Sequence, residues 1–250
     1  MSTVLAYKDG DKVWLAADSQ ATKGDQKILI TDPNNFKIWR PKMHQNLIMG
    51  GIGTLRDLNI VSTVDVWFDE KISTGSMVED YELNFSEMVR TIVPSLQSEI
   101  TSLGGHNKSS FFMAYKDKCF SIDPDGCVIE LYSDNDYAAI GSGEVVTEAA
   151  FSVLHDLELI STKEKIVRAV GQSCEQDLCV NYPILIMNTK DLELEIFDGE
   201  FLHTADGQAI PFHEISDYEF QKEIVGMPEF TEEDFEDEVD EKDLRCEITD

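Results

Sequence analysis

Basic residues are scarce in this chain. Its 250 residues include 20 lysines and arginines against 49 aspartates and glutamates, which gives a formal net charge of −29. Nucleic-acid binding requires cationic side chains that replace phosphate counterions, and anionic membrane surfaces also attract basic segments. We therefore expect neither nucleic acid nor membrane as a partner. The acidity favours solubility and basic partners, but it does not by itself indicate a function.

Long apolar runs and paired cysteine motifs are also missing. No apolar stretch reaches the length of a bilayer-spanning helix, and Met1–Gly10 lacks the basic, apolar and small-residue layout of a signal peptide. The five cysteines are odd in number and form no CxxC pair, which argues against a structural zinc site or a disulfide framework. We expect reduced thiols, a cytoplasmic location, and no metal or cofactor.

What the chain does contain is enough apolar residues for a core, arranged in alternating β-rich and helical blocks. Hydrophobic residues make up 42% of the chain, which supports a substantial buried core. β-rich and helical patterns alternate along the chain, over about residues 2–49, 54–103, 109–132, 143–176 and 183–197. Pro94, inside the second helical pattern, predicts a kink there. Two strand blocks, each followed by paired helices, predict an α+β fold with two sheets face to face and helices outside, an α-β-β-α sandwich.

The composition changes after Gly207. Residues 229–250 hold 12 acidic and 2 basic side chains, and a block of like charge usually stays solvated. We therefore predict one domain over residues 1–207 and an acidic C-terminal extension over 208–250, mobile from about residue 229. Phe230 and Phe235 among the acids leave a short docking motif as an alternative.

Ser2 could provide a nucleophile. Because serine is small, we expect Met1 to be removed by methionine aminopeptidase, which leaves Ser2 with a free α-amine of ordinary pKa about 7.7–8.0. The hydroxyl and a general base then belong to one residue, and the amine can accept the hydroxyl proton directly or through water. Taken alone this signal is weak, since many proteins begin with Met-Ser.

The surrounding segments strengthen the signal from Ser2. Residues 2–6 (STVLA), a turn, and residues 17–22 (ADSQAT) resemble the opening of the proteasome β and HslV peptidases, whose nucleophile is the N-terminal residue. The separation of 16 residues between Ser2 and Asp18 matches that layout. A start at Thr3 would turn the side chain to the opposite face of the strand.

The resemblance implies roles for four further residues near the start. Asp18 belongs to the catalytic group, and Gln20 and Thr22 bind substrate. A lysine on a following strand should lower the pKa of the nucleophile. Lys37, alone between apolar neighbours, fits that role, with Lys27 as the alternative.

The later segments extend the resemblance. Residues 46–53 (NLIMGGIG) are similar to the strand that supplies an oxyanion donor, a role that we assign to Gly50 or its neighbour Gly51, because glycine allows close approach to a backbone N–H. The glycines could equally just end a strand. Met49 would then lie near the specificity pocket.

The segment 138–143 (AAIGSG) resembles the family's AIGSG segment, and Ser142 would hydrogen-bond around the nucleophile's amine. Asp177, in the loop after a helix, would help to hold Ser142. As a plain motif, GSG before a helix could also be a capping turn or a phosphate-binding bend. The family prefers threonine as nucleophile, so Ser2 predicts a slower or more ester-like enzyme.

Three functions remain open at this stage. The first is a self-compartmentalising peptidase subunit that acts on peptides or unfolded proteins, assembles as a homo-oligomeric ring and works with a separate AAA+ unfoldase, since no GxxxxGK[ST] motif is present. The second is an inactive ring or scaffold subunit of the same fold with an acidic docking tail. The third is an N-terminal-nucleophile amidohydrolase acting on small amides.

Overall fold

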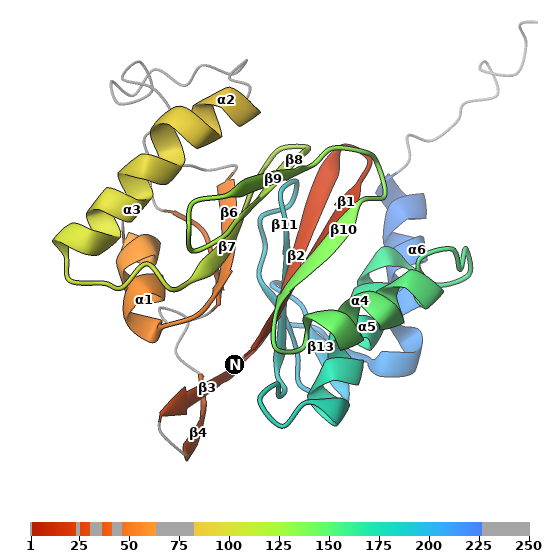
Figure 1. Ribbon diagram of the computed structural model, residues 1–250. Helices are drawn as coiled ribbons and strands as arrows, with labels where there is room; N and C mark the ends of the chain where they lie inside the picture. The colour runs from red at the N-terminus through yellow and green to blue at the C-terminus, as the bar shows by residue number, and fades with distance from the viewer. Residues whose placement is uncertain (1, 24–25, 31–36, 42–46, 64–82, 227–250) are drawn as a thin grey trace, which may run out of the picture.

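The computed structural model describes residues 2–23, 26–30, 37–41, 47–63 and 83–226 (Figure 1). A β1–β2 hairpin forms the start of the fold, with β1 at Thr3–Asp9 and β2 at Lys12–Asp18. Its turn contains Gly10 at φ +58°, a left-handed conformation that glycine adopts without strain. The turn expected between these two strands is confirmed.

Two antiparallel sheets form the body of the molecule. The first has seven strands in the order β10 (Tyr137–Gly141), β1, β2, β11 (Ile184–Asn188), β12 (Glu195–Phe197), β13 (Phe201–His203) and β14 (Ala209–Pro211). The second has five strands in the order β5 (Ile38–Trp39), β6 (Leu47–Ile52), β7 (Ser110–Tyr115), β8 (Lys118–Ile122) and β9 (Val128–Leu131). A separate two-stranded sheet pairs β3 (Gln20–Lys23) with β4 (Gln26–Leu29) directly after β2.

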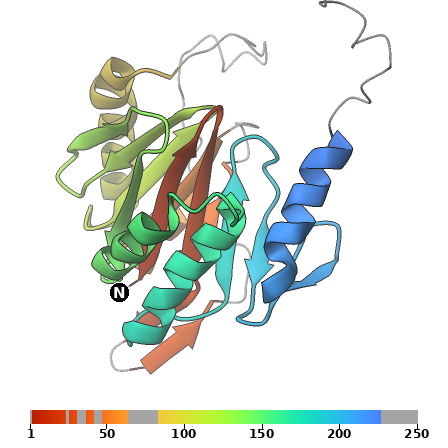
Figure 2. The same cartoon turned by 90° about the vertical axis from the view of Figure 1, so that its right-hand side faces the viewer.

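Alternation along the strands divides the core into three apolar clusters. On β1, Val4 contributes to the cluster between the two sheets, where it joins Phe112 of β7. Its neighbour Leu5 contributes to the outer cluster, beneath α4 (Glu144–Leu154) and α5 (Thr162–Gln176). A third cluster lies between the five-stranded sheet and α1 (Leu55–Thr63) with α3 (Val93–Ser102). The layers therefore run helix, sheet, sheet, helix, as expected (Figures 1 and 2).

The second helical pattern contains an irregular segment at the place where Pro94 predicted a kink. A short α2 (Phe85–Glu87) passes into a π-helical segment, Met88–Ile92, and then into α3, whose second residue is Pro94. Proline lacks the N–H that an α-helix would use at this position, so a locally wider helix accommodates it. In the described part of the chain, no helix combines the length and the apolar character needed to cross a bilayer.

The domain continues beyond residue 207, so our predicted boundary is wrong. β14 pairs with β13 in the seven-stranded sheet, and α6 (Ile215–Gly226) follows it. Ile215 is fully buried in the outer cluster with Ile166 of α5, and Figure 2 shows α6 beside α5. The acidic segment after residue 207 therefore begins with a packed strand, β14, and a packed helix, α6. The segment expected to be mobile from residue 229 lies outside the described residues.

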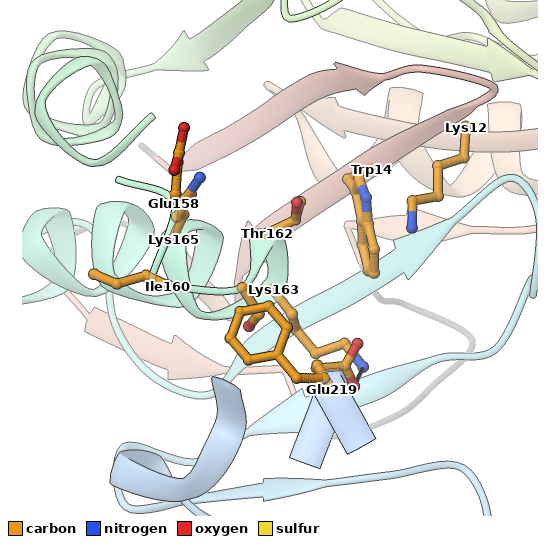
Figure 3. Close-up of a pocket in the computed structure, with 10 residues that line it drawn as sticks. Lys12, Trp14, Glu158, Ile160, Thr162, Lys163, Lys165 and Glu219 are labelled. Atoms are coloured by element: carbon orange, nitrogen blue, oxygen red, sulfur yellow. Dashed lines mark hydrogen bonds and ion pairs between the residues drawn. The ribbon is translucent and has the colours of Figure 1, made fainter. Parts of the chain in front are cut away.

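Charged groups fasten α6 to the body (Figure 3). Lys163 of α5 is almost completely buried, and its Nζ lies 2.6 Å from Glu195 of β12 and 2.7 Å from Glu219 of α6. Burial opposes its charge, but the two carboxylates outweigh that effect and raise the pKa of Lys163. The indole of Trp14 lies beneath the ammonium group, 5.8 Å from it, at the wall of a cavity of about 210 Å³ between β2, α5 and α6.

Candidate active site

Asp18 is the centre of the hydrogen-bond network at the end of β2. Its side chain is fully buried, and Oδ1 accepts hydrogen bonds from Lys37 Nζ at 2.7 Å and from the backbone N–H of Thr3 at 2.9 Å. Oδ2 accepts from the N–H groups of Gln20 at 2.9 Å and Asn181 at 3.4 Å. One carboxylate thus joins the start of β1, the segment before β5 and the loop before β11.

Lys37 directly precedes β5 and reaches Asp18 from the second sheet. Only 2% of its side chain is exposed. Burial lowers the pKa of Lys37, and the attraction and hydrogen bond of Asp18 oppose that shift without cancelling it. The ammonium group therefore holds its proton less firmly than an exposed lysine does. The alternative, Lys27, is exposed on β4 opposite Thr22, away from this pair.

The 138–143 segment lies against the backbone of Ser2. β10 pairs with β1 so that Gly141 lies opposite Thr3. The carbonyl of Ser2 accepts from the N–H of Gly143 at 3.4 Å and from the hydroxyl of Ser142 at 3.5 Å. Gly141 has φ +113°, and a Cβ on it would lie 2.1 Å from the Ser2 carbonyl oxygen. Glycine is therefore required at position 141 for this close approach.

The side chain of Thr3 points to the helix-covered face of the first sheet. Its hydroxyl lies 3.1 Å from that of Thr147 on α4, which in turn lies 2.7 Å from Ser173 on α5. Because strand neighbours alternate, the same rule directs the side chain of Ser2 to the opposite face, toward the second sheet from which Lys37 extends. The hydroxyl of Thr3 is therefore already engaged in hydrogen bonds on the helix-covered face.

Asp177 caps the end of α5, and its Oδ1 accepts the N–H of Cys179 at 2.8 Å. Burial alone would raise the pKa of Asp177, but hydrogen bonds from Ser142 and Cys179 outweigh it and lower the pKa. The carboxylate is thus held in its charged form beside Ser142. The structure brings Ser2, Ser142 and Asp177 into one chain of contacts.

The two glycines of β6 have their amides engaged in the sheet. The N–H of Gly51 donates to the carbonyl of Lys37 at 2.9 Å. Successive amides of a strand point to opposite edges, so that of Gly50 is directed to its partner Phe112 on β7. A Cβ on Gly50 would lie 2.9 Å from Val4. Packing between the sheets thus explains this glycine without an oxyanion role.

The three residues expected to bind substrate lie in different environments. Met49 is fully buried in the cluster beneath α1 and α3, so our expectation that it lies at a specificity pocket is wrong. Gln20 is also buried, with 2% exposure. Thr22 is exposed on β3.

Sequence reasoning missed Cys174. Burial raises the pKa of its thiol to about 12, with a further contribution from the charge of Asp18 and an opposing one from Lys37. The thiol is therefore an uncharged neighbour of the ion pair. Its place on α5, one helical turn before Asp177, was the available signal. Nothing local in the sequence connects it with Asp18, 156 positions earlier.

The helix–sheet–sheet–helix layers agree with the resemblance of the sequence to the proteasome β and HslV peptidases. The family model described as "Proteasome subunit" matches residues 1–186. The chain belongs to the proteasome subunit family. None of the curated proteins matches it.

Solved structures show the same fold at low sequence identity. HslV from Trypanosoma brucei superposes with a TM-score of 0.55 at 21% identity, over 74% of this chain and 98% of that one. A protein titled BPH from Thiobacillus denitrificans gives 0.59 at 15% identity, over 74% and 96%. Anbu from Hyphomicrobium sp. strain MC1 gives 0.55 at 17% identity, over 92% and 99%. The likeness to Anbu thus extends over a larger share of this chain.

Proposed function

We propose that this chain is a peptidase subunit that hydrolyses peptide bonds through Ser2, after removal of Met1. The hydroxyl oxygen of Ser2 attacks the peptide carbonyl, and its proton passes to the α-amine of the same residue. Collapse of the tetrahedral intermediate breaks the C–N bond, and the amine returns a proton to the leaving group. Water then hydrolyses the acyl-enzyme ester and restores the hydroxyl.

The observation that carries the proposal is the anchoring of residues 2 and 3. The Lys37–Asp18 pair binds the N–H of Thr3, and the Gly141–Gly143 segment holds the carbonyl of Ser2. Two anchors on consecutive residues fix the start of the chain beside a buried cation, and such preorganisation is what a nucleophile requires. Desolvation offsets much of the attraction in a buried ion pair, so stability alone is a weak explanation for the Lys37–Asp18 pair beside residues 2 and 3.

The other site residues take supporting roles in this proposal. Lys37 favours the ionised hydroxyl, and Asp18 holds Lys37 in place. Ser142 and Asp177 orient the amine. The oxyanion is bound by a backbone amide of the Gly50–Gly51 segment, and for Gly51 the bond to the Lys37 carbonyl must be shared or released when substrate binds.

We further propose a homo-oligomeric ring that encloses the sites, with peptides or unfolded proteins as substrates. Family membership and the HslV-like fold support this arrangement. Energy for unfolding would come from a separate AAA+ protein. The formal net charge of −29 favours a soluble assembly and basic partners.

Epoxomicin offers a direct test, since the BPH protein has been solved in complex with it. Intact mass should show that Met1 is absent and that one inhibitor is added per chain. The adduct should be lost in Ser2→Ala, which still permits Met1 removal, and kept in Ser102→Ala, an exposed serine at the end of α3. Retention of Met1, or labelling that survives Ser2→Ala, overturns the proposal.

The rival functions give different results in the same samples. A ring by size-exclusion chromatography that never reacts identifies an inactive ring subunit. A monomer that reacts but cleaves only small amides identifies an amidohydrolase.

A further inference from the structure

The side chain of Gln20 lies at the junction of two loops of the site. Gln20 begins β3, two residues after Asp18. Its backbone N–H donates to Asp18 Oδ2 at 2.9 Å. Its side-chain Nε2 donates to the carbonyl of Leu178 at 3.2 Å, directly after Asp177. One residue therefore bonds to Asp18 through its main chain and to the Asp177 loop through its side chain.

Two backbone contacts join the same loops. The N–H of Ser19 donates to the carbonyl of Asn181 at 3.2 Å, and the N–H of Asn181 donates to Asp18 Oδ2 at 3.4 Å. A substitution leaves those backbone donors in place. Gln20 is the side chain through which the connection can be tested.

Packing alone does not account for a glutamine at this position. Its Oε1 atom is buried, and no described residue donates a hydrogen bond to it. A buried acceptor left unpaired costs about 1–3 kcal/mol. An apolar side chain of similar size would fill the space without that cost, so the donor group of Gln20 is the feature that needs an explanation.

We infer that Gln20 is a positioning residue that holds the Asp177 loop in register with Asp18, and that it does not contact substrate. The inference rests on the proposed function. With 2% of the residue exposed, no substrate reaches its side chain in this arrangement. The loop contains Asp177, whose carboxylate accepts hydrogen bonds from Ser142 and from the N–H of Cys179. Displacement of the loop would therefore disturb Ser142 and, in the proposed mechanism, the orientation of the α-amine of Ser2.

Kinetics of Gln20→Leu test this role. We expect kcat for peptide cleavage to fall by about 100-fold, the effect of a displacement of roughly 1 Å at a catalytic group, with KM unchanged. A substrate-binding role would instead raise KM and leave kcat unchanged. The matched control is Gln26→Leu, the same change at an exposed position of the same two-stranded sheet, which should keep both constants.

Gln20→Glu gives a signature that a purely structural role would not. A protonated glutamic acid can donate to the Leu178 carbonyl, whereas the ionised form cannot and would lie buried close to Asp18 and Asp177. The activity of this variant relative to the unmodified protein should therefore rise as pH falls. A ratio independent of pH overturns the inference.

Hydrogen exchange provides a readout that does not depend on activity. Loss of the Gln20 bond should make the amides of residues 177–182 exchange about fivefold faster, while those of β1 are unchanged. Unchanged exchange in a reactive enzyme overturns the role of Gln20 alone. Faster exchange in a protein that never reacts with epoxomicin overturns the proposed function and leaves the loop contact.

Discussion

Lys37 and Lys163 are both buried ammonium groups bound to carboxylates, but their surroundings differ. Lys37 has 2% of its side chain exposed and pairs with one carboxylate, that of Asp18. Lys163 has 4% exposed and pairs with two, those of Glu195 and Glu219. Burial lowers the pKa of Lys37 despite Asp18, whereas the two glutamates raise the pKa of Lys163 against the effect of burial.

The number of counter-charges distinguishes the two lysines and supports the chemical role that we propose for Lys37. Lys163 joins α5, β12 and α6, and its single positive charge faces the two negative charges of Glu195 and Glu219. Lys37 is under-compensated, since Asp18 also binds the N–H groups of Thr3, Gln20 and Asn181. A cation with incomplete neutralisation can still stabilise a developing negative charge nearby. Lys163 has no such capacity left.

The largest expected difference is in reactivity. Lys37→Met should slow epoxomicin labelling of Ser2 by about 10³-fold, within the range typical of a group that assists proton transfer. Lys163→Met, the same change at the structural site, should leave the rate per folded chain within about threefold. Labelling rates are measured by intact mass at a fixed inhibitor concentration. Equal losses in both variants would remove the distinction.

The second difference is in stability. Lys163→Met removes the buried cation that binds Glu195 and Glu219, and breaking a buried ion pair in this way costs about 3–5 kcal/mol. Lys37→Met should cost less, because three backbone N–H groups still bind Asp18. Urea unfolding at fixed protomer concentration measures both.

A rescue variant separates charge from packing at Lys163. Adding Glu195→Gln and Glu219→Gln to Lys163→Met removes the two negative charges that faced the lysine and should recover more than half of the loss. If the triple variant is no more stable than Lys163→Met, the ion pairs are not the cause.

Much of the site was predictable because it follows from order along the chain. Asp18 and Lys37 were identified by their places after the first two strands, and the structure brings them together at 2.7 Å. Alternation distinguished Ser2 from Thr3. These inferences use the order of residues along the chain and the alternation of side chains between the two faces of a strand, and both can be read from the sequence.

The errors arose where the answer depends on which face of a sheet is covered. Met49 was expected at a pocket, but its side chain faces α1 and α3, and the sequence of β6 does not say on which side those helices pack. Gln20 was expected to bind substrate, but only 2% of it is exposed, and the sequence does not show that the distant Asp177 loop lies against it. The predicted domain boundary at residue 207 was wrong because it relied on the change in charge composition. The short strand and helix that follow are stabilised by contacts with Lys163 and Ile166, which lie far earlier in the chain.

The smallest expected difference is in how stability depends on alkaline pH. The raised pKa of Lys163 means that its contribution is complete below the ordinary value of 10.5 and is lost as pH rises through the raised value. For Lys37 the sign is opposite. The unfolded chain holds this proton up to about pH 10.5, the ordinary pKa of lysine, while the folded chain releases it at a lower pH. The free energy of unfolding therefore rises with pH between the lowered pKa and 10.5.

The loss of unfolding free energy caused by Lys163→Met should therefore shrink above pH 10.5. The loss caused by Lys37→Met should grow as pH approaches 10.5. Each slope is limited to about 1.4 kcal/mol per pH unit for one proton. Urea unfolding of the three proteins from about pH 8 to pH 11 measures the differences, in which all other titrating groups cancel. Parallel curves would show that the two lysines have the same pKa in the folded protein, and the comparison between them would fail.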